Sequence, residues 1–152
     1  MDSKDRRILE LLQQNAMLTA AELAEEVGLT TTPCWRRIQK LEEQGYIKAR
    51  VALLDRHKMN VGITVFVAVR TSRHSGDWLK RFLAAVQAMP EIVEAHRLSG
   101  DTDYMLRIVV PSIDEYDRVY QQLIKELEFF DVSSSFSMEE IKSTTAVPVR
   151  HA

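Results

Sequence analysis

The sequence has few of the residues from which several common kinds of site are built. Cys34 is its single cysteine, which excludes an intramolecular disulfide and a metal cluster built on thiolates. Its four histidines are scattered and show no metal-ligand spacing. A Ser/His/Asp set and a phosphate-binding loop are also missing. We therefore expect no enzyme, no catalytic residue, no cofactor and no metal site.

Long apolar runs and a strong net charge are missing as well. The longest apolar run, residues 63–69, is far too short to cross a bilayer, and the charged start MDSKDRR precedes no apolar segment of a secretory signal. These features predict a cytoplasmic protein without a membrane partner. The formal charge is −2, so any affinity for nucleic acid has to come from a local patch. Residues 30–50 supply one, with five basic residues against two acidic ones.

Residues 19–45 carry the signals of two short helices joined by a tight turn. Thr19 and Glu22 have the spacing of a capping box, which predicts a helix from residue 20. Gly28 suits the left-handed position that ends such a helix. Thr32 before Pro33 predicts the N-cap and first residue of the next helix, which buries Cys34, Ile38 and Leu41 and ends at residue 45. With a further helix over residues 4–14, the pattern is a three-helix helix-turn-helix domain.

The second helix of this pair turns its polar and basic side chains outward. A helix seated in the major groove presents hydroxyl and N–H groups of its first turn to phosphates, and side chains of the next turn to base edges. In the alternative interpretation Trp35 packs on the first helix and the arginines form a solvated face. The predicted DNA-binding residues are Thr30, Thr31, Thr32, Trp35, Arg36, Arg37, Gln39 and Lys40.

The rest of the chain predicts a second domain of a different class. Residues 46–55 read as a strand, forming a wing or the exit from the helical domain, and residues 55–62 as a hinge. From residue 63 the pattern is β-α-β-β-α-β, the ferredoxin-like arrangement. The expected division is therefore 1–54, 55–62 and 63–152, an α+β chain. The tail 142–152 contains Ala146, Val147 and Val149, and is expected to pack on another part of the protein.

The predicted strand at residues 63–70 is apolar on both faces. Two helices can cover only one face of the sheet, so the other face has to meet a second apolar surface. A second copy of the same chain is the simplest source, which predicts a homodimer or an assembly of dimers. A dimer would read two half-sites about one helical turn, roughly 34 Å, apart or a multiple of it.

Five segments resemble the Lrp/AsnC (leucine-responsive, feast/famine) family of transcription regulators: DRRILELLQQNA, LAEEVGLTTTPCWRRIQKLEEQGYI, VALLD, LSGDTDYML and EIKSTTAVP. The resemblance implies a helix-turn-helix domain joined by a hinge to a ligand-sensing domain, and dimers that assemble into tetramers or octamers. It also implies a small amino-acid effector such as cysteine, leucine or methionine. The chain departs from the family pattern at Thr30, where serine is usual, and at Phe129 and Phe130, where glycine is common.

In the family, the turn that matches SGDTDY lies where subunits meet and small amino acids bind. Gly100 would let the backbone approach a ligand closely, and Asp101 and Asp103 would accept hydrogen bonds from an ammonium group. Gly and Asp are equally what any hairpin turn prefers, so a purely structural role stays open. The predicted effector-binding residues are Gly100, Asp101, Asp103, Tyr104, Ser133, Ser134 and Ser135.

These observations predict a sequence-specific DNA-binding transcription regulator whose activity responds to a small effector. The alternative is a less specific, nucleoid-organising DNA-binding protein without a strong effector response. Both would use the same helix-turn-helix, and they differ in the ratio of specific to non-specific affinity.

Overall fold

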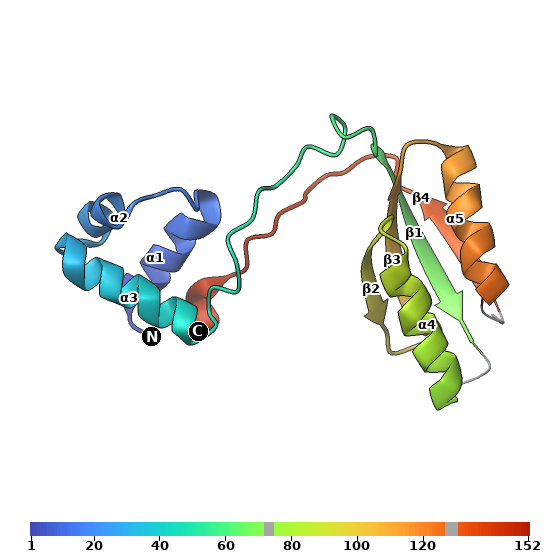
Figure 1. The fold of residues 1–152 in the computed structure, drawn as a ribbon, viewed down its shortest axis with the longest axis horizontal. Coiled ribbons are helices and arrows are strands. Elements are labelled where there is room, and N and C mark those ends of the chain that lie inside the picture. The colour runs from blue at the N-terminus through green and yellow to red at the C-terminus, as the bar shows by residue number, and fades with distance from the viewer. Residues whose placement is uncertain (72–74, 127–130) are drawn as a thin grey trace. The chain divides into compact units, whose positions relative to one another are not determined.

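The computed structural model describes residues 1–71, 75–126 and 131–152, so Phe129 and Phe130 lie outside the described residues. The chain divides into two compact units (Figure 1). The first, here called the helical unit, combines Met1–Leu53 with Lys142–Ala152, and the second, the sheet unit, is Leu54–Ile141. Among the described residues, no helix is both long and apolar enough to span a membrane.

The helical unit contains α1 (Ser3–Gln14), α2 (Ala20–Val27) and α3 (Thr31–Glu43). The capping box of Thr19 and Glu22 is present at the start of α2, and Gly28 ends α2 in the left-handed region with φ 61°, as predicted. One apolar face of each helix turns inward to a shared core. That core consists of Ile8, Leu9, Leu11, Leu23, Ala24, Val27, Cys34, Ile38, Leu41 and Val149.

Two local predictions for this unit are wrong. Helix α3 has Thr30 as its N-cap and Pro33 as its third residue, whereas the sequence predicted Thr32 and Pro33 as N-cap and first residue. The first four N–H groups of a helix have no intrahelical acceptor, so proline fits at the third position too. Residues 46–55 form no strand: Ile47 packs on the helical core, but Val51 and Leu53 are exposed. None of the strands that the structure describes pairs with the backbone of this segment.

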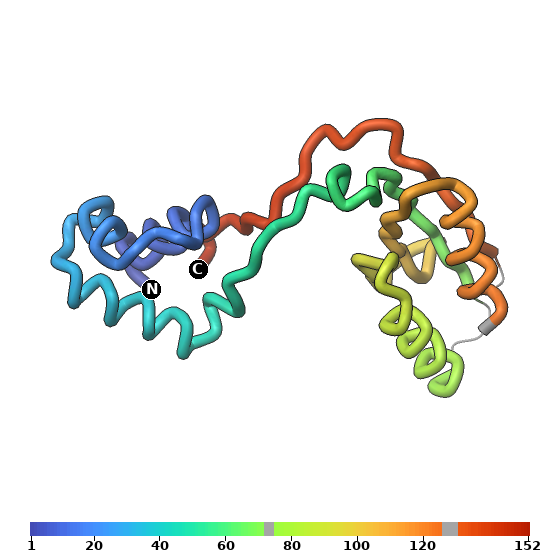
Figure 2. The backbone as a smooth tube through the Cα atoms, turned by 45° about the horizontal axis from the view of Figure 1, so that its top comes forward, coloured from blue at the N-terminus to red at the C-terminus, as the bar shows by residue number. Residues whose placement is uncertain are grey.

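The C-terminal tail belongs to the helical unit, although the sequence placed it in the second domain. The ribbon and tube views both show it ending beside α1 (Figures 1 and 2). The Gln13 side chain donates to the Val147 carbonyl at 3.1 Å and accepts from the Val147 N–H at 2.7 Å. Arg6 donates twice to the Ala152 carbonyl, at 2.9 and 2.7 Å. Val149, in the short 3₁₀ helix η1 (Val149–His151), is buried in the helical core.

The sheet unit has the predicted ferredoxin-like order. Its strands pair antiparallel in the order β2-β3-β1-β4, and both helices lie on one face (Figure 1). The elements are β1 (Ile63–Arg70), α4 (Gly76–Ala88), β2 (Ile92–Arg97), β3 (Tyr104–Val110), α5 (Ile113–Glu126) and β4 (Asp131–Phe136).

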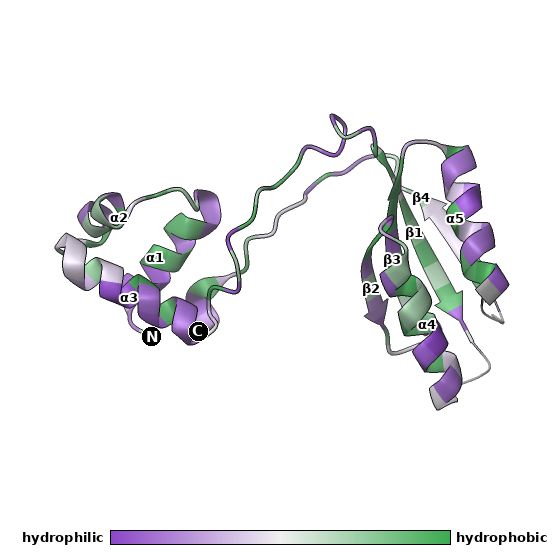
Figure 3. Cartoon of the chain, viewed as in Figure 1, coloured by the Kyte–Doolittle hydropathy of each residue, from purple (hydrophilic) through white to green (hydrophobic). Residues whose placement is uncertain are grey.

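Strand β1 carries apolar side chains on both faces of the sheet, but those on one face are buried and those on the other are partly exposed. Val65, Val67 and Val69 of β1 are buried under the helices, and β1 is drawn mostly in the hydrophobic colour (Figure 3). Phe66 points to the face without helices and keeps 41% of its surface exposed. Because paired residues share a face, Arg107 of β3 and Ser135 of β4 lie beside it.

The predicted hinge at residues 55–62 is a hydrogen-bonded turn of the sheet unit. The Asp55 carboxylate accepts from the N–H groups of His57 and Lys58, at 2.9 and 3.3 Å. The Asp55 and Arg56 carbonyls accept from the N–H groups of Met59 and Val61, at 3.0 and 2.9 Å. An Asp side chain that binds the backbone two residues on is a typical turn former, so this segment has a defined local conformation.

Candidate DNA-binding and effector sites

Helix α3 presents one polar face to solvent in the helical unit. Thr31, Thr32, Arg36 and Lys40 are exposed, and Trp35 keeps 52% of its surface exposed. About half of the Trp35 surface is therefore open to solvent. The opposite face holds the buried side chains of the core, so the polar face is fixed by the packing of the helix.

The N-terminal end of α3 is open to an anion. Thr30 is the N-cap, but its hydroxyl makes no capping hydrogen bond. The N–H groups of a helix's first turn have no intrahelical acceptor, and the helix dipole places partial positive charge there. A phosphate oxygen is a suitable acceptor for such groups. The three threonines at residues 30–32 surround this end with exposed hydroxyls.

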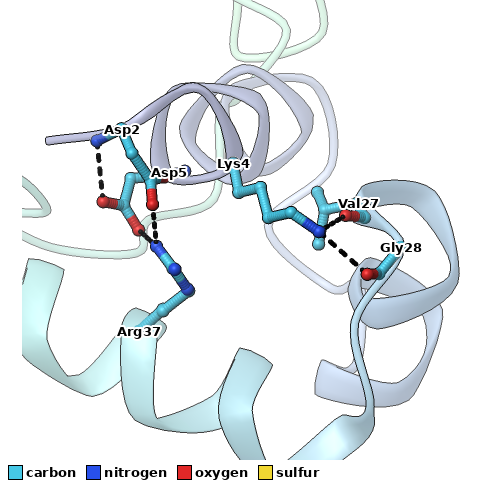
Figure 4. A network of polar contacts seen from close by, with 6 residues as sticks. All are labelled: Asp2, Lys4, Asp5, Val27, Gly28 and Arg37. Atoms are coloured by element: carbon cyan, nitrogen blue, oxygen red, sulfur yellow. Dashed lines mark hydrogen bonds and ion pairs between the residues drawn. The ribbon is translucent and has the colours of Figure 1, made fainter.

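The basic residues of α3 differ in what they already bind. The side chains of Arg36 and Lys40 make no hydrogen bond or ion pair with any residue that the structure describes. Arg37, by contrast, donates through Nη1 to the carboxylates of Asp2 and Asp5, each at 2.7 Å (Figure 4). The hydrogen bond to Asp5, and then that to Asp2, raises the pKa of Arg37. Two of the predicted DNA-binding cations are thus available, and the third is engaged within the protein.

Two side chains donate to the Glu42 carboxylate near the end of α3. Gln39 donates to the Glu42 carboxylate at 3.2 Å. Arg50 donates to the same carboxylate at 2.9 Å and to the Ala16 carbonyl at 3.3 Å. The charge of Arg50 is therefore largely balanced, and Arg36 and Lys40 dominate the exposed charge of α3.

The predicted effector turn joins β2 to β3. It is closed by a hydrogen bond from the Leu98 N–H to the Asp103 carbonyl, at 2.8 Å. Gly100 has φ 109°, a region that side chains other than glycine rarely adopt. The Asp101 carboxylate is exposed and binds no described residue. Gly100 and Asp101 together offer an open backbone and a carboxylate at one point of the surface.

The other predicted effector residues are not all at this point. The Asp103 carboxylate accepts from the Thr71 N–H at 2.8 Å, and the Asp103 N–H donates to the Val69 carbonyl at 3.0 Å, so this residue ties the turn to the end of β1. Tyr104 is in the core, where its ring lies 4.5 Å from that of Phe82 and 5.8 Å from that of Trp78. The sequence analysis grouped Tyr104 with the preceding turn residues, and so did not predict that it points into the core as the first residue of β3.

The three serines of β4 lie on two faces of the sheet. Ser134 faces the helices, where its hydroxyl is hydrogen-bonded to that of Tyr116. Ser133 and Ser135 pair with Ala68 and Phe66 and share the opposite, helix-free face. Since Tyr104 pairs with Val69, next to Ala68, Ser133 lies nearer the turn than Ser135 does. Of these serines, Ser133 is thus the one placed toward the effector turn.

The sequence prediction missed the acidic start of α1. Asp2 and Asp5 form a capping box there, and Arg37 binds both carboxylates. The hydrogen bond from the Asp5 N–H, followed by that from Arg37, lowers the pKa of Asp2. The D-x-x-D spacing could have predicted the cap. No local pattern could have predicted the pairing with Arg37, which is more than thirty residues away in the chain.

Comparison with protein families gives two matches along the chain. Residues 1–48 match a winged helix-turn-helix DNA-binding domain, and residues 64–147 match the Lrp/AsnC ligand binding domain. The chain belongs to the Lrp/AsnC family. It is a DNA-binding transcription regulator with a ligand-binding domain, and its relatives are transcription regulators, not enzymes. The resemblance expected from the sequence is thereby confirmed.

Individual relatives match over nearly the whole chain. The glutamate uptake regulatory protein of Zymomonas mobilis is 51% identical over 149 residues, covering 98% of this chain and 91% of that protein. The crystal structure of an AsnC family transcriptional regulator from Agrobacterium tumefaciens is 56% identical, with a TM-score of 0.96 and 99% coverage of both chains. A transcriptional regulator of Neisseria meningitidis, solved as a complex with L-Met, is 36% identical with a TM-score of 0.94, covering 99% and 98%.

Proposed function

We propose that this chain is a sequence-specific transcription regulator that binds operator DNA as a homodimer, or a larger assembly of dimers, and responds to a small α-amino acid. The observation that carries the proposal is the exposed face of α3, on which Arg36 and Lys40 bind no described residue. Relatives over the whole chain length are transcription regulators, which supports the same reading.

The DNA contact follows from the geometry of α3. The major groove admits a helix, and the open N-terminal end with its threonine hydroxyls suits a phosphate. Arg36 and Lys40 are four residues apart, so they lie on one side of the helix, one turn apart. Each bidentate contact of such a side chain with a guanine edge contributes about 1–3 kcal/mol of discrimination between bases.

The second copy would cover the helix-free face of the sheet. Phe66 and Ala68 of β1, and Met105 and Val109 of β3, share this face through their pairing register. This strip is partly exposed, with Arg107 beside Phe66, and its apolar side chains favour association with another largely apolar surface. In a two-fold dimer the same strip of each copy would meet the other, and the dimer would present two α3 helices to two half-sites.

The effector is proposed to bind at the turn around Gly100. The exposed Asp101 carboxylate would accept from the ammonium group, and backbone N–H groups of the open turn would bind the carboxylate. A relative that is 36% identical has been solved with L-Met, which supports an amino acid such as methionine, leucine or cysteine. Ser133 of β4 lies at the same end of the sheet as this turn, but at the edge opposite β2.

Titration of the full chain with a fluorescent fragment of its own promoter tests the DNA function. We expect the promoter to bind more tightly than a scrambled fragment, and Arg36→Ala and Lys40→Ala each to weaken promoter binding at least fivefold, since one lost base contact costs about 1 kcal/mol or more. Lys80→Ala, an equal charge change on exposed α4, is the matched control. Equal affinity for promoter and scrambled DNA across a salt series would instead support the nucleoid-organising alternative.

A thermal-shift screen of the twenty amino acids tests the effector. A ligand at a hundred times its Kd stabilises the folded state by about 2.7 kcal/mol, a readily measured shift. We expect one or a few amino acids to shift the wild type, and Asp101→Asn to abolish that shift. Glu139→Gln, which removes an exposed carboxylate elsewhere in the sheet unit, should leave it unchanged. No shift with any amino acid would contradict the proposed effector class.

A further inference from the structure

The first turn of α1 binds both other helices of the helix-turn-helix. Its Lys4 ammonium donates to the carbonyls of Val27 and Gly28, each at 2.8 Å (Figure 4). These carbonyls lie at the C-terminal end of α2, where a helix has unsatisfied acceptors and partial negative charge. Lys4 therefore holds the end of α2, from which the chain turns into α3.

The same turn of α1 holds α3 through two carboxylates. Asp2 and Asp5 lie three residues apart, and both accept from Nη1 of Arg37 at 2.7 Å. The Asp5 side chain is only 17% exposed and that of Arg37 32%, so solvent screens this pair less than an open surface pair. Hydrogen bonds between ionised partners are stronger than neutral ones and fix the geometry more firmly.

We infer that Arg37 is a positioning residue, and that Asp2, Lys4 and Asp5, here called the α1 clamp, set the orientation of α3 for DNA reading. The inference rests on the proposed DNA-binding function of α3. Arg37 does not itself read bases, because its guanidinium is engaged by the clamp. Arg36 and Lys40 contact the bases instead, and their position depends on the orientation in which the clamp holds α3.

An orienting clamp and a simple charge effect predict opposite changes in DNA affinity for the substitution Asp5→Asn. Asp5→Asn removes a negative charge near the DNA-binding helix and releases part of Arg37. On charge alone, both changes strengthen binding to the phosphate backbone. If the clamp orients α3, the same substitution weakens operator binding, because Arg36 and Lys40 are displaced from their base contacts. Asparagine still offers an acceptor to the Asp2 N–H, so the cap of α1 is retained.

The test is a titration of the full-length chain with promoter and scrambled fragments over a series of KCl concentrations. The variants are Asp5→Asn, Arg37→Ala, Arg37→Lys and the reading variant Arg36→Ala. Glu43→Gln is the matched control for Asp5→Asn, since it removes an exposed acid from the end of α3. Far-UV circular dichroism at the titration temperature verifies that each variant is folded.

We expect Asp5→Asn and Arg37→Ala to lower the ratio of promoter to scrambled affinity at least about fivefold, the effect of one misplaced base contact. Arg37→Lys should recover part of this loss, because one ammonium can bind both carboxylates. The salt slope should stay as in the wild type for Arg37→Ala, because its guanidinium binds the clamp and not a phosphate. Glu43→Gln should bind as the wild type or more tightly.

Tighter promoter binding by Asp5→Asn, or a reduced salt slope for Arg37→Ala, would overturn the positioning role while leaving the proposed function in place. A wild-type chain without preference for its promoter would overturn the proposed function itself, and the inference with it. Should Arg37→Ala be unfolded, Asp5→Asn and Arg37→Lys decide the question alone.

Discussion

The C-terminal tail offers two valines that differ in burial but not in chemistry. Val149 is 9% exposed and packs in the helical core, whereas Val147, two residues earlier, is 67% exposed. We predict that Val149→Ala destabilises the helical unit and that Val147→Ala does not. A buried methyl group contributes about 0.8 kcal/mol, so losing two costs about 1.5 kcal/mol, with little added for a cavity at the edge of the core.

Val147→Ala is the closest possible control, because Gln13 binds the backbone of Val147 and not its side chain. Surface substitutions of this kind change stability by less than about 0.5 kcal/mol. The two variants therefore separate core packing from any general effect of altering the tail.

Hydrogen exchange monitored by mass spectrometry measures the helical unit separately from the sheet unit. A loss of about 1.5 kcal/mol lowers the protection of core amides roughly tenfold where exchange requires unfolding of the unit. We expect this in peptides from α1 and α3 of Val149→Ala, with β1 and β3 unchanged. Equal protection of α1 and α3 in both variants would refute the argument that the tail completes the helical core.

Three further predictions concern other parts of the chain. Hydrogen bonds from the backbone and hydroxyl of Thr19 lower the pKa of Glu22, so the stability that they add is present above the ordinary pKa of 4.5 and is lost as the pH falls through the lower folded value. Thermal unfolding should therefore show the wild type losing stability relative to Glu22→Gln below about pH 4.5. Parallel stability curves for the two proteins would contradict this. Burial raises the pKa of the Cys34 thiol, so iodoacetamide should label native protein far more slowly than unfolded protein. Similar labelling rates for the native and unfolded protein would be inconsistent with a buried thiol. If the proposed dimer forms through the helix-free face, Phe66→Lys should shift the wild-type sedimentation coefficient toward that of a monomer, whereas Leu83→Lys on exposed α4 should not. The same assembly in both variants would exclude this face as the interface.

Local signals in the sequence predicted most of the fold. Thr19, Glu22 and Gly28 act through hydrogen bonds within a few residues, so their spacing predicted α2 correctly. The β-α-β-β-α-β order predicted from residue 63 onward likewise matches the observed order of strands and helices. Pro33 misled the prediction for α3 because proline is compatible with more than one position in the first turn.

Interactions between distant segments could not be predicted in the same way. The tail showed an apolar composition, but Val149 is buried against helices that precede it by more than a hundred residues. Residues 46–55 showed an apolar alternation, but a strand also needs a partner, and the sequence pattern carries no information about that partner. Asp103 and Tyr104 were grouped with the effector turn, although long-range contacts engage one with β1 and the other with the aromatic core.

Arg36 and Arg37 show this limit most directly. They are adjacent on one helix and equally basic, so helical periodicity gives both an outward position. A rotation of about 100° per residue nevertheless turns Arg37 toward α1 and Arg36 toward solvent. Only the acidic first turn of α1, folded against α3, distinguishes a cation held within the protein from one available to DNA. We therefore expect the DNA-reading surface to be smaller than the sequence predicted, with a specificity that depends on Arg36, Lys40 and the proposed clamp.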